Sequence, residues 1–251
     1  MSKVEVLVAA MHQHDHSLLE KMHIKTDAII GNQCDNNSVE IFKWNNHTIK
    51  YLNFAERGVG LNRNNALMRA SGDYCLFADD DMIYVDDYAE KVEKAFLQHP
   101  DADIIAFNLI EPVTKRYVIT KEYKVNFFNF LRFGTARVAI RLKSVRSMGI
   151  YFNQCFGGGT KHCHGEDNIF LSDCLKKKLK MYAVPEYIAE LTEVRVSTWN
   201  NGYDDKYLHD QGALYKMISP KWWKLLCLQD AIRHRKSYSS FWLKNYCKMI
   251  K

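Results

Sequence analysis

Three consecutive aspartates, Asp79, Asp80 and Asp81, directly follow the apolar run 74–78. Neighbouring carboxylates repel one another, so three of them at the end of a buried strand favour a bound cation. Alternate side chains of an extended segment point the same way, which would let Asp79 and Asp81 face one ion. Hard cations such as Mg²⁺ or Mn²⁺ prefer these oxygen ligands and complete their shells with phosphate and water. We therefore expect a divalent metal site, against the alternative of a solvated acidic turn or a helix N-cap.

A second pair of carboxylates, Glu166 and Asp167, follows Gly165 at the predicted start of a helix that runs to Leu175. A general base for a sugar hydroxyl needs an ionised carboxylate that local geometry holds in place. Helix capping explains the same two residues equally well, because acidic side chains are common at helix N-termini. The residues alone leave both interpretations open.

Two glycines and two arginines lie in the segment 57–64, just ahead of another predicted helix. Backbone N–H groups of this segment, together with Arg63, could hold a diphosphate. The chain has no P-loop pattern, which argues against a P-loop enzyme. Taken alone, the segment is better explained as a surface turn that leads into an amphipathic helix.

Histidines alternate at 12, 14 and 16, and a second cluster reads His162-Cys163-His164. Imidazole and thiolate groups bind zinc, but neither cluster has a second ligand pair at the spacing of a zinc site. Cys163 lacks any motif that would mark it as a nucleophile. We expect both clusters to be loop residues that line a substrate cleft, without a catalytic role.

The elements that must position these residues alternate between strands and helices. This order predicts an α/β fold with an open, mostly parallel sheet flanked by helices. Ligands of such folds bind beyond the carboxyl ends of the strands, where the three aspartates lie. Apolar runs predict strands at 4–10, 27–31, 74–78, 104–107 and 137–142, and helical spacing covers 64–70, 88–99 and 165–175.

The amino-acid composition is that of a folded, globular protein. Hydrophobic residues make up 47% of the 251 residues and charged ones 25%, which supports a packed core and excludes a disordered chain. The seven cysteines form no C-x-x-C pair, as expected in a reduced compartment. Neither a signal peptide nor a run of roughly 18–20 apolar residues occurs. We expect a cytoplasmic protein that is neither exported nor threaded through a bilayer.

Charge divides the chain into a body, residues 1–215, and a basic, aromatic tail, residues 216–251. Nine bases against one acid give the tail +8, whereas 26 bases against 28 acids give the body −2. The tail also carries tryptophans and other large apolar residues. A basic amphipathic helix of this kind suits the inner, anionic face of a membrane, and packing on the body is the alternative. Nucleic acid is not expected, because no RNA-binding motif surrounds the aromatic residues.

Taken in order, these motifs resemble the family 2 glycosyltransferases of the GT-A fold, especially bacterial members that build capsular or other surface polysaccharides. The strand-end aspartates look like the D-x-D metal motif of that family. Residues 60–66, Gly-Leu-Asn-Arg-Asn-Asn-Ala, are similar to its G-L-x-x-x-R-N segment, and residues 165–170, Gly-Glu-Asp-Asn-Ile-Phe, to its G-E-D-x-x-F segment. Residues 199–203 and 210–215 look like a motif of one bacterial subgroup. Many members place a metal-ligating histidine where this chain has residues 191–194.

The resemblance implies a mechanism. Asp167, with Glu166 beside it, would deprotonate an acceptor hydroxyl as that hydroxyl attacks the anomeric carbon opposite the diphosphate, which inverts the configuration. Mn²⁺ or Mg²⁺ held by Asp79 and Asp81 would offset charge on the leaving group. The nucleotide would contact a set of residues near the strand ends, namely Ala9, Ala10, Asn32, Gln33, Asp35, Arg63, Asp79 and Asp80.

The expected activity is transfer of a sugar from a nucleotide diphosphate sugar, a UDP-sugar first of all, to a hydroxyl of a glycan or a lipid-linked acceptor. Two other functions remain open. One is a non-catalytic nucleotide-sugar-binding partner of a membrane glycosyltransferase complex. The other is a metal-dependent nucleotidyltransferase, which would release pyrophosphate in place of a nucleoside diphosphate.

Overall fold

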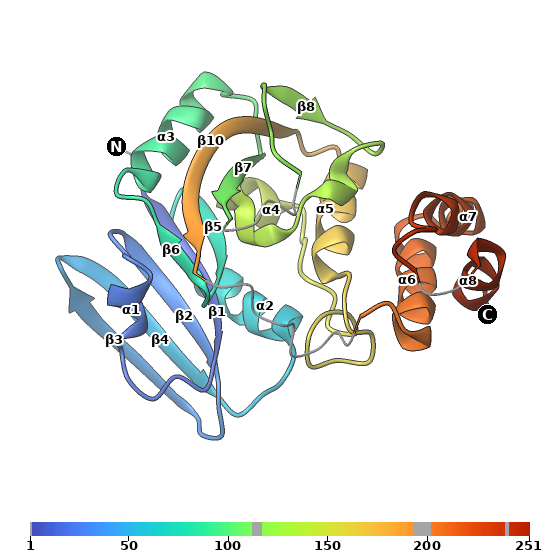
Figure 1. Cartoon of the computed structure of the whole chain (residues 1–251). Coiled ribbons are helices and arrows are strands. Elements are labelled where there is room, and N and C mark those ends of the chain that lie inside the picture. Colours follow the sequence, from blue (N-terminus) through green and yellow to red (C-terminus); the bar gives the residue numbers. More distant parts are fainter. Residues whose placement is uncertain (1, 112–116, 193–201, 239–240) are drawn as a thin grey trace.

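The computed structural model describes residues 2–111, 117–192, 202–238 and 241–251. One mixed sheet forms the centre of this part of the chain, with helices on both sides (Figure 1). Its order is β3-β4-β2-β1-β5-β9-β7-β10-β6, and β8 pairs with β10. The strands are β1 (Val4–Met11), β2 (Asp27–Gln33), β3 (Ser38–Trp44), β4 (His47–Phe54), β5 (Tyr74–Asp79), β6 (Met82–Tyr84), β7 (Ile104–Ile110), β8 (Tyr123–Val125), β9 (Val138–Arg141) and β10 (Met181–Leu191).

The half of the sheet built from β4, β2, β1 and β5 is parallel. Its register places Ala9 beside both Gly31 and Asp79, so the carboxyl ends of these strands lie along one edge of the sheet. Beyond β5 the sheet is no longer purely parallel, because β9 pairs antiparallel with both β5 and β7. The predicted α/β fold is therefore confirmed, with a parallel half that ends at the aspartates.

Strands β1 and β5 are apolar on both faces because each face meets a separate core. Val6 and Val8 of β1 belong to the core cluster that includes α3, whereas Leu7 belongs to the cluster under α2 and α5. In β5, Leu76 belongs to the first of these clusters and Phe77 to the second. Burial on both faces explains why these strands were evident as continuous apolar runs.

The helices that cover the sheet are short. Among the described residues they are α1 (Leu18–Lys21), α2 (Val59–Arg69), α3 (Tyr88–Gln98), α4 (Leu142–Ser147), α5 (Glu166–Lys176), α6 (Asp205–Ile218), α7 (Trp223–Arg233) and α8 (Trp242–Met249), with 3₁₀ turns η1 (Phe130–Arg132) and η2 (Thr135–Arg137). Helix α2 starts five residues before the predicted 64–70, because Gly58, at φ 121°, occupies its N-cap. The glycine-rich segment is thus largely the first turn of a helix.

The hairpin of β3 and β4 did not emerge from the apolar pattern. Strand β3 lies at the edge of the sheet and is mostly exposed, so its sequence carries no buried run. Asn45 and Asn46 form the turn with positive φ angles of 46° and 69°, a conformation that asparagine tolerates better than most residues.

The C-terminal residues form two helices rather than the single one expected. Helices α6, α7 and α8 pack together to one side of the sheet (Figure 1). A Cβ on Gly212 of α6 would lie 1.7 Å from the carbonyl oxygen of Met249, so α8 rests directly on α6. The predicted boundary between residues 215 and 216 falls within α6, which belongs to two cores: Leu214 packs in the cluster under α5, and Tyr215 in that of α7 and α8.

None of the helices in the described ranges combines the length and apolarity needed to cross a membrane.

Candidate functional site

Arg63 of α2 lies at the centre of a cluster of carboxylates. Its side chain is only 4% exposed. Nη2 donates to Oδ1 of Asp79 at 2.8 Å, and Nη1 donates to Oε1 of Glu166 at 3.0 Å and to Oδ1 of Asp167 at 2.7 Å. Asp79 ends β5, whereas Glu166 and Asp167 begin α5. One guanidinium therefore joins the strand-end aspartates to the Gly-Glu-Asp segment, and the nitrogens expected to meet a diphosphate are directed at carboxylates.

The charge of Arg63 is maintained by these neighbours. Burial alone would lower the pKa of Arg63, but the carboxylates of Asp167, Asp79 and Glu166 outweigh burial and raise that pKa above its usual range. The guanidinium carbon also lies 5.5 Å from the centre of the Phe152 ring, a cation–π contact. Arg63 is thus a permanent positive charge inside the protein.

Asp167 is held from two sides. The Thr135 hydroxyl and Nη1 of Arg63 both donate to Oδ1, and the Thr135 backbone N–H donates to Oδ2 at 3.1 Å. Gly134, just before Thr135, leaves room for this carboxylate, since a Cβ there would lie 3.1 Å from Oδ2. The Asp167 side chain remains 25% exposed. It is a fixed carboxylate that solvent, and hence a substrate, can reach.

Glu166 differs from Asp167 in its burial. Its side chain is 12% exposed, and burial raises its pKa to about 7, with the Asp167 charge acting in the same direction and Arg63 opposing. A Cβ on Gly157 would come within 2.7 Å of the Glu166 carboxyl, so the backbone at that glycine closes the pocket around it. Two adjacent carboxyl groups thus have unequal environments, and the more exposed one is Asp167.

The aspartates 79–81 do not form one extended segment. Asp79 is the last residue of β5, whereas residues 80 and 81 form a turn before β6. The alternation assumed for Asp79 and Asp81 was therefore wrong, because the extended backbone that it requires ends at Asp79. Oδ2 of Asp80 accepts from the backbone N–H of Met11 at 3.4 Å, toward the end of β1. The N–H and hydroxyl of Thr192 donate to the Asp81 carbonyl, and residues 193 and 194 of the segment compared with the histidine of the family lie outside the described residues.

A pocket of about 460 Å³ opens beyond the carboxyl ends of β1 and β2. It contains all three histidines of the first cluster, and the ring of His16 stacks on Phe42 at 4.4 Å between ring centres. Its rim is polar and acidic. The lining residues are His12, Gln13, His14, Asp15, His16, Cys34, Asp35, Asn36, Ser38, Glu40, Tyr51 and Asn53.

The residues predicted to contact the nucleotide divide into two groups around this pocket. Asp35 lines it and pairs with Arg57. Asn32 and Gln33 are buried instead: Asn32 exchanges hydrogen bonds with the backbone of Gln13, and Oε1 of Gln33 accepts from the N–H of Gly58. The structure thus gives Asn32 and Gln33 a part in shaping the loops around the pocket. Ala9 and Ala10 are buried within β1.

Among the residues that the structure describes, we consider two sets with the chemistry of metal ligands. Asp79 and Asp81 offer oxygen atoms, which suit hard divalent cations such as Mg²⁺ and Mn²⁺. Cys163, His164 and Asp210 offer sulfur, nitrogen and oxygen atoms that lie within 4.8 Å of one another. This second set escaped the sequence pattern because Asp210 follows the other two by 47 and 46 positions.

The sequence model of the family described as "Glycosyl transferase family 2" matches residues 6–153. That range includes Arg63 and the three aspartates and ends before Glu166. No curated protein sequence matches the chain.

Among solved structures, the fold is similar to that of S. aureus TarS. The superposition covers 99% of this chain and 55% of the TarS chain, with a TM-score of 0.62 and 13% identity, so the chain spans just over half of the length of that protein. The shorter TarS 1–349, of which 90% is covered, superposes with a TM-score of 0.61 both in complex with UDP-GlcNAc, at 12% identity, and in complex with UDP, at 13%. At these identities the likeness establishes a shared fold.

Proposed function

The chain belongs to glycosyl transferase family 2, and from this premise we propose that it is an inverting, metal-dependent transferase. It moves a sugar from a UDP-sugar to a hydroxyl of a glycan or lipid-linked acceptor in the synthesis of a surface polysaccharide. The observation that carries the proposal is the bridge made by Arg63, which brings Asp79 of β5 and Asp167 of α5 onto one guanidinium. A metal-and-diphosphate site and a fixed carboxylate would then share one cleft.

The donor would bind at the carboxyl ends of β1, β2 and β5. The pocket lined by residues 12–16 and 34–36 opens there, beside the turn that carries Asp80. Its imidazole and phenol rings offer flat faces to a nucleobase, and Asp35 and Asn53 offer hydrogen-bonding groups. The TarS 1–349 complexes with UDP-GlcNAc and UDP support this choice of nucleotide for a similar fold.

The metal would be held by Asp79 and Asp81. Their carboxylates are oxygen ligands of the kind that Mn²⁺ and Mg²⁺ take, and Asp79 is 41% exposed although Arg63 engages its Oδ1. When bound, the ion would supply positive charge to the leaving diphosphate. Asp80, whose carboxylate faces the end of β1, would contact the nucleotide.

Asp167 would be the general base. It takes the proton of the acceptor hydroxyl while the hydroxyl oxygen forms a bond to the anomeric carbon and the bond to the diphosphate oxygen breaks. Attack from the face opposite the leaving group inverts the configuration. Thr135 and Arg63 hold the carboxylate in one orientation, and a fixed base avoids the entropic cost of ordering it during the reaction.

Residues 216–251 would rest on an anionic membrane surface, which places the enzyme on the inner face of the membrane near a lipid-linked acceptor. One part of the apolar surface of α7 and α8, including Cys227 and Met249, packs against α6. Another part is open: Trp222 is 65% exposed and Leu225 is 56% exposed, and lysines flank both. Exposed tryptophan and leucine beside basic residues suit a lipid interface.

Thermal unfolding with UDP tests the donor site. UDP should raise the melting temperature in the presence of Mn²⁺, and Asp81→Asn should abolish the shift, because the ion would link this carboxylate to the diphosphate. The matched control is Asp103→Asn, at a loop that contacts Lys180, which should keep the UDP shift. A shift that persists after metal removal would exclude the metal role of Asp81.

A further inference from the structure

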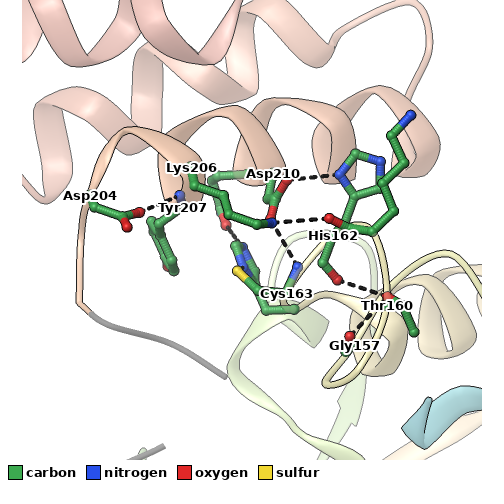
Figure 2. A network of polar contacts seen from close by, with 11 residues as sticks. Gly157, Thr160, His162, Cys163, Asp204, Lys206, Tyr207 and Asp210 are labelled. Carbon is green, nitrogen blue, oxygen red and sulfur yellow. Dashed lines mark hydrogen bonds and ion pairs between the residues drawn. The ribbon is translucent and has the colours of Figure 1, made fainter. Parts of the chain in front are cut away.

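A second cluster of ligand-type side chains lies where the segment leading into α5 meets α6 (Figure 2). Cys163 and His164 come from that segment, directly before Gly165, and Asp210 comes from α6. Their Sγ, imidazole nitrogen and carboxylate atoms lie within 4.8 Å of one another. Ligand atoms around tetrahedral zinc lie roughly 3–4 Å apart, given metal–ligand bonds of about 2.0–2.3 Å. Small rotations of the side chains would therefore close the cluster around one ion.

The orientation of His164 is fixed by its neighbour on α6. Nε2 lies 2.8 Å from Oε1 of Gln211, an oxygen that can only accept, so Nε2 carries the proton. The lone pair is then on Nδ1, which lies 3.2 Å from Sγ of Cys163. A partner on the outer nitrogen that fixes the tautomer and directs the other nitrogen inward is typical of metal-binding histidines.

Asp210 is held in place as firmly. It is buried, and its carboxylate accepts from the Cys163 backbone N–H at 2.8 Å and from Lys206 Nζ at 2.6 Å, and meets Nδ1 of His162 at 2.8 Å (Figure 2). Lys206 is the exposed member of this set, with 56% of its side chain accessible. Its ammonium group rests on Oδ2 of Asp210 and can swing into solvent, which would leave that oxygen to an ion.

We propose that Cys163, His164 and Asp210 form a zinc site that fastens α6 to the segment preceding α5. The thiolate and imidazole ligands favour Zn²⁺ over Mg²⁺ or Mn²⁺, and a water molecule would complete a tetrahedral shell. On binding, Sγ of Cys163 loses its proton to solvent and Lys206 leaves Asp210. The site is structural and independent of the sugar chemistry. It also gives a role to Asp210 and Gln211, which belong to the 210–215 motif.

Cobalt(II) titration of the full chain, free of tags, stripped of metal and kept reduced, tests the proposal. We expect one equivalent of Co²⁺ to produce a thiolate-to-cobalt charge-transfer band, which zinc then displaces. Cys163→Ser should remove the band. Cys155→Ser, at an exposed cysteine of the same segment, should keep it, as should Asp81→Asn. Gln211→Leu should weaken binding about 10–100-fold, the usual effect of losing an outer-shell partner.

Alkylation of the unmodified chain gives a second readout that needs no variant. Zinc should protect Cys163 from iodoacetamide, measured on its peptide by mass spectrometry, while the exposed Cys155 and Cys247 react equally with and without zinc. The proposal is overturned if no charge-transfer band forms, if the band survives in Cys163→Ser, or if zinc leaves the alkylation of Cys163 unchanged. Each of these results leaves the proposed transferase activity untouched.

Discussion

Nη1 of Arg63 donates a hydrogen bond of 2.7 Å to Oδ1 of Asp167, a residue 104 positions later in the chain. Through its other terminal nitrogen, the same guanidinium reaches Asp79. The bond therefore fixes the distance between the end of β5 and the start of α5. In the proposed enzyme these are the leaving-group side and the base side of the cleft.

Asp167→Asn should lower kcat by about 10²–10⁴, the usual contribution of a general base. Asparagine retains the shape, and its Oδ1 can still accept from Arg63 and the Thr135 hydroxyl, whereas the Thr135 N–H loses its acceptor. These contacts lie outside the proposed donor site, so UDP binding should be unchanged. Sugar transfer rates and UDP thermal shifts measure the two effects separately. Asp173→Asn, at an exposed position of the same helix that pairs with Lys176, is the matched control and should keep the wild-type rate. Wild-type transfer by Asp167→Asn would remove this residue from the mechanism.

Arg63→Met should destabilise the fold by about 3–5 kcal/mol, because it removes a buried counter-charge from Glu166 and Asp167, whose side chains are only 12% and 25% exposed. Urea unfolding of the metal-free protein measures this loss. In the control, Arg69→Met changes an exposed arginine of the same helix, where the expected loss is about 1 kcal/mol or less. Equal losses in both variants would show that the carboxylates do not depend on Arg63.

Titration of Glu166 should make the free energy of unfolding depend on pH. Burial raises its pKa from the ordinary 4.5 to about 7 in the folded protein, so the folded state holds a proton that the unfolded chain releases. The stability that the protonated Glu166 carboxyl group contributes is therefore fully present below about pH 4.5 and is lost as the pH rises through 7. Glu166→Gln should gain stability relative to wild type between pH 5 and 7, as measured by urea unfolding with metal chelated. The exposed Glu20→Gln should show no such trend, and its absence in Glu166→Gln would contradict the burial argument.

What the sequence could reveal about the fold depended on burial. Strands such as β1 and β5 are covered on both faces and so were evident as apolar runs, whereas the edge strand β3 exposes Val39 and Ile41 and gives no such signal. The motif residues Asp79 and Asp167 could be found individually. Their connection through Arg63 could not, because it depends on how the sheet brings distant segments together.

Dependence on tertiary contacts also explains why the sequence did not reveal the sites that the two histidine clusters help to form. Regular spacing within a short segment is the signal of a zinc site in a sequence, and His162-Cys163-His164 lacks it. The partners Asp210 and Gln211 come from α6, a helix whose position against this segment is a tertiary feature. The pocket formed by His12, His14 and His16 likewise depends on β3 and β4, which the apolar pattern did not predict.

Membrane association should depend on the exposed apolar residues of the C-terminal helices. Leu225→Ser should lower the affinity for anionic vesicles, measured by sedimentation, roughly tenfold. This change corresponds to about 1.4 kcal/mol, as expected for a leucine that is partly buried in the lipid interface. Salt should weaken vesicle binding further, because it screens the attraction between the lysines and the anionic lipids. Ile41→Ser, at a residue of β3 that is even more exposed than Leu225, is the control and should sediment as wild type. Binding that is insensitive to Leu225→Ser would favour a purely structural role for the tail.

Incubation of the purified chain with a panel of nucleotide sugars and Mn²⁺ is the most direct test of the proposed transferase, because water can take the place of the acceptor hydroxyl and release the nucleoside diphosphate. We predict release of UDP from at least one UDP-sugar, lost on chelation of the metal and in Asp81→Asn. Release of pyrophosphate would indicate nucleotidyl transfer instead. The absence of UDP release from every donor of the panel would contradict the proposal.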